Sequence, residues 1–113
     1  MIVLRMELNR RRLRTLVHVC ESEFERARGL LFRRRPGPDE AWLIPCCRAV
    51  HTVGLWYRLD LAFCTRDGTI VDLVTDVRPW RVARSEDATQ VWEFPRGAVE
   101  TLELRPGDRL TAR

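Results

Sequence analysis

The sequence predicts a mainly β fold, an antiparallel β-sandwich of jelly-roll-like or barrel-like form with two short helices. Short runs of β-branched and apolar residues alternate with turn signals along most of the chain. Only two segments have the pattern of a helix, and both are short. The 113 residues, 45% of them apolar and 32% charged, suffice for the core of one domain. We therefore expect a single domain over residues 13–113.

The first residues of the chain, 1–12, show no clear hydrophobic period, and we expect them to form a frayed leader. The next segment, 13–20, reads L-R-T-L-V-H-V-C. Because β-branched and apolar residues dominate this segment, it predicts the first strand of the domain.

A short helix is predicted directly after this strand. Ser22 and Glu25 form the S-x-x-E pattern of a capping box, in which each partner satisfies an exposed amide of the first helical turn. Phe24, Ala27 and Leu31 follow at helical spacing, so they should face the core. The Pro-Gly-Pro run that follows ends the helix.

The middle of the chain predicts three strands and one tight turn. Residues 41–46 form an apolar run of strand length, in which Pro45 indicates an edge or a bend. Residues 59–64 and 69–75 flank Arg66-Asp67-Gly68. Since the Asp-Gly pair is the best hairpin signal in the chain, these two runs should pair as a hairpin.

The last third of the chain predicts a long connection, two strands and a helix. Residues 77–87 read as a polar excursion, and 90–94 alternate loosely as in a strand. Residues 95–104 can form a second short helix. A Pro-Gly turn then leads into a final short strand at 109–112.

The formal net charge of +4 raises the question of nucleic-acid binding. Every basic residue is arginine, a bias that we attribute to GC-rich coding. The clusters 10–12 and 33–35 could contact phosphates, but no recognisable nucleic-acid motif or interleaved aromatic residue accompanies them. We therefore interpret both clusters as solvated basic faces and expect no nucleic-acid partner.

No apolar run approaches the length of a membrane span, and the N-terminus lacks the pattern of a signal peptide. We therefore expect a cytoplasmic protein. Cys20, Cys46, Cys47 and Cys64 should then be free thiols, because the cytosol is reducing. Cys46 and Cys47 are adjacent, so one strand would point them to opposite faces and at most one would reach a shared site.

The segment 47–60 holds the residue types of a nucleophilic site. Cys47 could act as nucleophile, His51 as base and Asp60 as the carboxylate that orients the ring. Equally, Cys47 could be a plain core residue, and His51 could hydrogen-bond loop backbone. Asp60 lies between two leucines, so it either points outward or ties down an arginine or a loop amide. Metal binding is not expected, since C-x₂-C and H-x₃-H spacings are absent, and no cofactor is expected.

Two tryptophans fall in segments that read as loops, where large aromatic residues line a pocket or plug the end of a sandwich. If the two loops meet at one end of the fold, they form a binding surface. The residues expected to form it are Arg48, His51, Thr52, Trp56, Asp60, Trp80 and Arg81.

Six short motifs occur in a fixed order along the chain. They are A-R-G-L-L-F-R at 27–33, H-T-V-G-L at 51–55 with L-D-L-A-F at 59–63, D-G-T-I-V at 67–71, R-P-W-R at 78–81, F-P-R-G at 94–97 and G-D-R-L at 107–110. In this order they resemble the DUF192 family of uncharacterised proteins. Cys47, four residues before His51, resembles one subgroup of that family. Leu55 and Glu103 depart from the usual Met and Gly.

The resemblance implies a compact, jelly-roll-like β-sandwich with short helices. It implies no activity, because the family has no established biochemical function, and a fold alone supplies none. From the residues, we expect a non-enzymatic domain that binds a small molecule or a protein segment at the two-loop surface. The alternative is a small cysteine-dependent enzyme with Cys47 as nucleophile and His51 as base. The sequence carries no indication of the oligomeric state.

Overall fold

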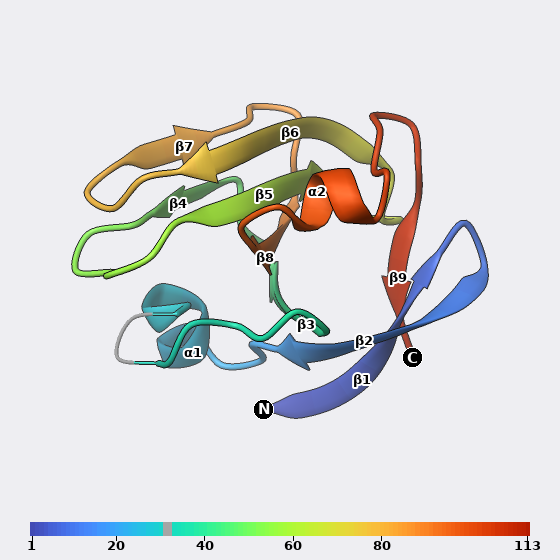
Figure 1. Ribbon diagram of the computed structural model, residues 1–113, viewed down its shortest axis with the longest axis horizontal. Coiled ribbons are helices and arrows are strands. Elements are labelled where there is room, and N and C mark those ends of the chain that lie inside the picture. Colours follow the sequence, from blue (N-terminus) through green and yellow to red (C-terminus); the bar gives the residue numbers. More distant parts are fainter. Residues whose placement is uncertain (31–32) are drawn as a thin grey trace.

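The computed structural model describes residues 1–30 and 33–113, apart from the side chains of Phe24 and Arg28. This part of the chain contains nine strands and two short helices (Figure 1). Their bounds are β1 Ile2–Leu8, β2 Arg11–Val19, α1 Glu23–Arg28, β3 Glu40–Pro45, β4 Ala49–His51, β5 Leu59–Cys64, β6 Ile70–Val77, β7 Val82–Arg84, β8 Gln90–Pro95, α2 Ala98–Thr101 and β9 Leu110–Ala112. The predicted mainly β class with two short helices is confirmed.

Among the described strands, seven form one sheet in the order β6-β5-β8-β3-β2-β1-β9, while β4 and β7 pair separately. The pairing of β2 with β3 is parallel, and every other strand pair is antiparallel. The sheet is therefore mixed rather than purely antiparallel, since α1 and the chain after it form a crossover between these two strands. The two edges of the sheet meet at an isolated bridge between Thr69 and Arg109, without closing into a barrel.

The expectation of a frayed leader is wrong for residues 2–8, which form β1. This strand pairs with β2 through a turn at Asn9 and Arg10, both of which have positive φ, as a type I′ hairpin turn requires. Met6 and Leu8 are buried. The alternation L-R-M-E-L that places these two side chains inside is present in the sequence, but it spans only five residues.

The capping box of α1 is confirmed. The Glu25 amide donates to Ser22 Oγ at 3.0 Å, and the Ser22 amide donates to Glu25 Oε1 at 3.2 Å. Of the three side chains expected to face the core, those of Phe24 and Leu31 lie outside the described residues. Ala27 is exposed, which contradicts the expectation, because α1 borders a cavity instead of resting directly on the sheet.

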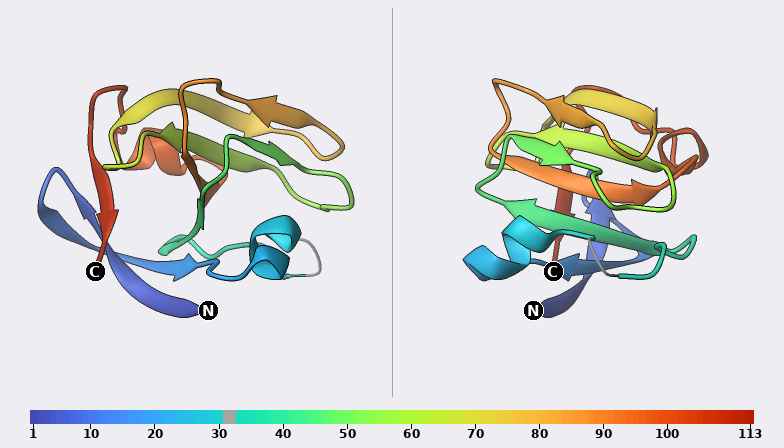
Figure 2. Two further views of the ribbon diagram at one scale, coloured as in Figure 1. Left: turned by 180° about the vertical axis from the view of Figure 1, so that it is seen from behind. Right: turned by 90° about the vertical axis from the view of Figure 1, so that its left-hand side faces the viewer.

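Both faces of the central strands are covered, so β5 is buried along its whole length. Trp92 and Phe94 of β8 belong to one apolar cluster, together with residues of α2. Leu61 and Phe63 of β5 belong to the other, which lies on the side of α1. Figure 2 shows the two helices on opposite sides of these strands. The core is thus divided by β5 and β8.

The predicted hairpin at Asp67-Gly68 joins β5 to β6, as expected. Gly68 has φ +93°, and a Cβ there would collide with the Leu110 carbonyl oxygen. The predicted polar excursion over 77–87 contains the short strand β7. Within the described residues, no helix has the length and apolar character needed to cross a membrane.

Candidate functional site

A cavity of about 420 Å³ lies between α1, the end of β3 and the segment 46–55. Apolar side chains, among them Leu30, Ile44 and Leu55, form most of its wall. Two polar side chains, Arg26 and His51, also line it. The wall combines segments that are far apart in the sequence, which is typical of a small-molecule site.

Glu93 lies at the base of this cavity, in the middle of β8. Its side chain is 2% exposed, and its Oε1 atom has no hydrogen-bond partner among the described residues. Burial raises the pKa of this carboxyl from 4.5 to about 7. Gly29 leaves room beside it, because a Cβ at that position would lie 3.2 Å from Oε1. A buried carboxyl group that lacks a partner commonly marks a functional site.

Sequence reasoning missed Glu93, although the sequence held a signal. The run V-W-E-F at 91–94 places a single carboxylate among bulky apolar residues in a predicted strand. Placing a charge there is costly unless it is paired or functional. Asp60, between two leucines, carries the same signal.

Glu93 belongs to a row of buried polar atoms that crosses three strands. His18 on β2 lies opposite Trp42 on β3, which lies opposite Glu93 on β8. Directly opposed residues share a face of the sheet. His18 Nδ1 and Trp42 Nε1, like Glu93 Oε1, have no partner in the described part of the chain. The His18 and Trp42 rings stack with centroids 4.2 Å apart.

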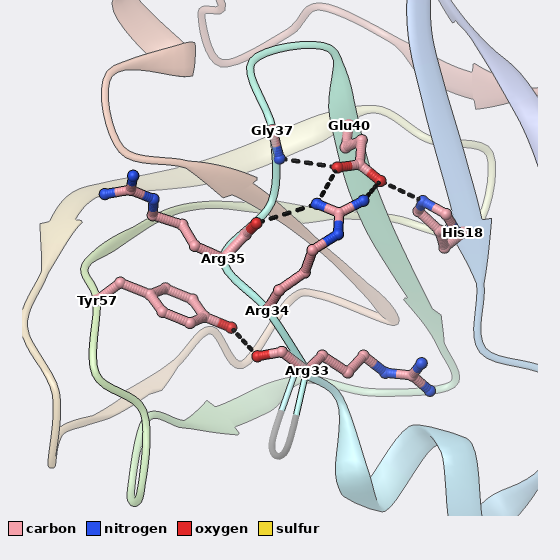
Figure 3. Close-up of polar contacts among 7 residues, drawn as sticks. All are labelled: His18, Arg33, Arg34, Arg35, Gly37, Glu40 and Tyr57. Atoms are coloured by element: carbon pink, nitrogen blue, oxygen red, sulfur yellow. Dashed lines mark hydrogen bonds and ion pairs between the residues drawn. The ribbon is translucent and has the colours of Figure 1, made fainter.

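The segment after the helix is held to the sheet by Glu40 (Figure 3). Its carboxylate accepts hydrogen bonds from Arg34 at 2.6 and 2.9 Å and from the Gly37 amide at 2.8 Å, and it lies 2.9 Å from His18 Nε2. Arg34, the largest cause, lowers the pKa of Glu40 to about 2. Arg33 lies over Trp42, with its guanidinium carbon 4.4 Å from the ring centroid. Two arginines of the basic cluster 33–35 are therefore engaged in contacts within the fold.

Cys47 and His51 both line the cavity, but they do not form a pair. The Cys47 thiol donates to the Ala49 carbonyl oxygen at 2.9 Å, and no hydrogen bond joins it to the His51 ring among the described residues. Burial raises the pKa of the Cys47 thiol, and the charge of Glu93 raises it further. The group is therefore a thiol at neutral pH, whereas nucleophilic catalysis needs the thiolate.

Cys46 and Cys47 both reach the cavity, which contradicts the expectation that at most one would. Cys46 follows the last residue of β3 and has φ +55°. This left-handed backbone conformation is not that of a strand, so the alternation on which the expectation rested does not apply to this pair.

Asp60 is 1% exposed and takes no part in the cavity wall. Its Oδ1 atom accepts from the Asp76 amide at 2.9 Å, and its Oδ2 atom accepts from the Gly97 and Val99 amides at 3.0 Å each. The carboxylate thus connects β6 to α2. The side chain therefore does not point outward; it ties down backbone amides, of which that of Gly97 lies in a loop.

Thr52 brings together the two loops that were expected to form one surface. Its amide donates to the Arg81 carbonyl oxygen at 2.8 Å, and its carbonyl oxygen accepts from the Trp80 amide at 3.0 Å. Its Oγ1 atom donates to the Arg78 carbonyl oxygen at 2.7 Å. The loops therefore lie side by side at one end of the molecule, on the left in Figure 1.

The remaining expected residues lie on the surface of that end. Trp56 is 95% exposed and Trp80 is 66% exposed, so neither plugs the sandwich. Arg81 is exposed, and Arg48 lies 4.0 Å from Glu86, outside the cavity wall. In the described residues, no group of three or more His, Cys, Asp or Glu side chains is placed to hold a metal ion.

By its fold, this chain is a small, mainly β protein with one mixed sheet of seven strands and two short helices in the part that the structure describes. Residues 5–112 match the model of the DUF192 family, described as "Uncharacterized ACR". The chain belongs to this family.

One named relative and two solved structures are similar to this chain over most of its length. The UPF0127 protein PF1050 of Pyrococcus furiosus is 30% identical over 103 residues, which cover 87% of each chain. A structure from Sinorhizobium meliloti 1021, described as a candidate transcription regulator, matches with a TM-score of 0.87 and 26% identity over 98% of this chain and 94% of that chain. A protein of unknown function from Novosphingobium aromaticivorans matches with a TM-score of 0.80 and 18% identity, over 96% and 84% of the two chains.

Proposed function

We propose that this protein is a non-enzymatic domain that binds a small molecule in the cavity between α1 and the segment 46–55. The observation that carries this proposal is the buried Glu93 carboxyl group, which borders an accessible cavity and whose Oε1 atom lacks a partner among the described residues. An unsatisfied buried acceptor is costly. A ligand that donates a hydrogen bond to it would remove that cost.

The cavity wall favours one class of ligand. Leu30, Ile44 and Leu55 suit an apolar body, while Glu93 suits a hydroxyl, amide or amine group at the buried end. Arg26 and His51 are placed to contact a polar or anionic tail. The expected ligand is therefore small and largely apolar, with a hydrogen-bond donor at one end.

The cysteine-enzyme alternative has less support. The Cys47 thiol has a raised pKa and donates to backbone, and the proposed carboxylate, Asp60, is occupied by three amides. A nucleic-acid role, which the description of the Sinorhizobium relative would suggest, gains little from residues 33–35, because Arg34 and Arg33 contact Glu40 and Trp42.

The test uses two probes of the same shape, indole and benzofuran, of which only indole has an N–H donor. Titration of ¹⁵N-labelled protein at mildly alkaline pH, followed by NMR, should show indole shifting the amides of Gly29, Ile44 and Val50 at lower concentrations than benzofuran. In Glu93→Leu this preference should vanish, while Glu100→Leu, on the exposed surface of α2, should retain it. Equal responses to both probes in the wild type would contradict the proposal.

A further inference from the structure

The end of the molecule that carries the two adjacent loops exposes an unusual group of apolar side chains. We call residues 53–58 and 78–82 the tip. Its exposed large apolar residues are Val53, Trp56, Trp80 and Val82, which are 39%, 95%, 66% and 73% exposed. Single apolar side chains are common on a protein surface, whereas a group of them on adjacent loops marks an interaction site.

The backbone holds these side chains outward. Trp80 has φ +63°, a left-handed conformation that is strained for a bulky residue. The Trp80 amide donates to Thr52 at 3.0 Å, and β7 pairs with β4 so that Val82 lies opposite His51. The hydrogen bonds and strand pairing around it thus stabilise a conformation that presents the indole to solvent.

The tip is also strongly basic. Its two segments contain three arginines, Arg58, Arg78 and Arg81, and no Asp or Glu. Arg58 pairs with Asp76, which lies outside the tip. Arg78 and Arg81 form no ion pair within the described residues. Positive charge therefore surrounds the exposed apolar side chains.

We propose that the tip docks on an anionic phospholipid surface. Tryptophan prefers the headgroup level of a bilayer, and arginines beside it attract anionic lipids. Neither signal alone gives stable binding, but the tip combines both. The two loops protrude from one end of the fold (Figure 1), a shape that can enter a deformable bilayer without a matching hollow. This inference is independent of the cavity proposal.

The arginines and the valines of the tip favour a bilayer over two other partners, a second copy of the chain and single-stranded nucleic acid. A second copy would place arginine against arginine, which is repulsive. Single-stranded nucleic acid could stack on the tryptophans, but it would leave Val53 and Val82 exposed without a role. A bilayer covers both kinds of side chain.

Vesicle co-sedimentation at low and at physiological salt tests the proposal. The probes are vesicles of phosphatidylcholine alone and of phosphatidylcholine with about one-third phosphatidylglycerol. The protein should bind the anionic vesicles at least about tenfold more tightly, and its tryptophan emission should shift to the blue. That shift reports on Trp56 and Trp80, because Trp42 and Trp92 are already buried.

Two variant pairs locate the contact. Trp56→Ala/Trp80→Ala and Arg78→Gln/Arg81→Gln should each weaken binding about tenfold or more. The matched controls are Val3→Ala/Leu16→Ala, exposed apolar residues elsewhere, and Arg11→Gln/Arg12→Gln, which changes the charge equally; both should bind as the wild type does. Circular dichroism confirms that each variant is folded.

Three outcomes would overturn the proposal. The first is no preference for anionic vesicles. The second is binding that the Arg11→Gln/Arg12→Gln control loses as much as the tip variants do. The third is tip-dependent binding of an oligothymidine strand without binding of vesicles, which would assign the tip to nucleic acid instead.

Discussion

At the scale of single residues, Glu93 is the group whose environment departs most from what its chemistry prefers. A carboxyl group on a central strand must give up water, and among the described residues no donor replaces that water at Glu93 Oε1. Its two neighbours in the row, His18 and Trp42, also have buried nitrogen atoms without partners. Natural proteins tolerate such atoms mainly where function requires them. This is the reason to place the ligand here.

The raised pKa of Glu93 predicts a dependence of stability on pH. Between pH 4.5 and about 7 the unfolded chain has lost this proton while the folded protein keeps it, so the free energy of unfolding falls as pH rises through this window. The loss is about 3 kcal/mol for a shift of this size. Glu93→Gln removes the titration, so its stability relative to the wild type should rise between pH 5 and pH 8 in urea unfolding. A constant difference between the two proteins would contradict the assignment.

The four thiols should differ in reactivity. Cys46 is exposed, whereas burial raises the pKa of Cys47, that of Cys20 to about 11 and that of Cys64 to about 12. Under native conditions at pH 8, iodoacetamide should modify Cys46 first and Cys47 slowly, with the other two protected. Mass spectrometry of the digested protein measures these rates.

The comparison with His51→Ala tests the enzyme alternative directly. Since the Cys47 thiol donates to the Ala49 carbonyl oxygen and forms no hydrogen bond with the imidazole among the described residues, its alkylation rate should be unchanged in this variant. Fast alkylation of Cys47 at mildly acidic pH that disappears without His51 would instead favour the cysteine-dependent enzyme.

At the scale of elements, buried polar side chains join segments that regular secondary structure does not connect. Thr52 joins the two loops of the tip, and Asp60 joins β6 to α2. Asp76, whose amide donates a hydrogen bond to Asp60, has φ +54°. The Asp60 carboxylate therefore also stabilises this irregular position in β6. Such connections replace the ladder hydrogen bonds that the loops lack.

Asp60→Asn should therefore be costly although it changes few atoms. One carboxylate oxygen becomes an NH₂ group, which faces a backbone amide and cannot accept from it. We expect a loss of about 2–4 kcal/mol in the free energy of unfolding, measured by urea denaturation. Asp87→Asn, at an exposed position, is the matched control and should change stability little. A similar small effect for both would show that Asp60 does not carry this tie.

Local signals predicted most of the elements, because they act within a few residues. The capping box at Ser22, the Asp-Gly turn at 67–68 and the strand 59–64 all follow from such signals. The parallel pairing of β2 with β3 could not be predicted, since pairing between distant strands leaves no local pattern. β1 was missed because its alternation covers only five residues.

The candidate site was predicted in part. The sequence pointed to Cys47 and His51, and the structure brings both to one cavity. The sequence alone did not reveal that the Asp60 side chain lies on the other face of β5. This strand is buried along its whole length, so its residues show no alternation from which the two faces can be told apart. Glu93 completes the cavity from a strand more than forty residues further along the chain, a distance at which sequence spacing carries no information.

At the scale of the whole molecule, β5 and β8 divide the core into two apolar clusters, and the cavity that Glu93 borders lies on the α1 side. On the other side, Ala98 and Val99 of α2 pack into the second cluster. Two contacts hold the chain that follows α1 (Figure 3). Glu40 accepts from the Gly37 amide, and the Tyr57 hydroxyl lies 3.4 Å from the Arg33 carbonyl oxygen. The α1 side of the fold thus carries the cavity that we propose as the ligand site.

The most direct test of the proposed site is the ¹³C titration of the Glu93 side-chain carboxyl, identified by its absence in Glu93→Gln, with and without indole. We predict a midpoint near pH 7 in the free protein, and a lower midpoint with indole bound, because an N–H donor stabilises the carboxylate. A midpoint near 4.5 that indole does not change would mean that the group is already solvated or paired, and would contradict a ligand site built on Glu93.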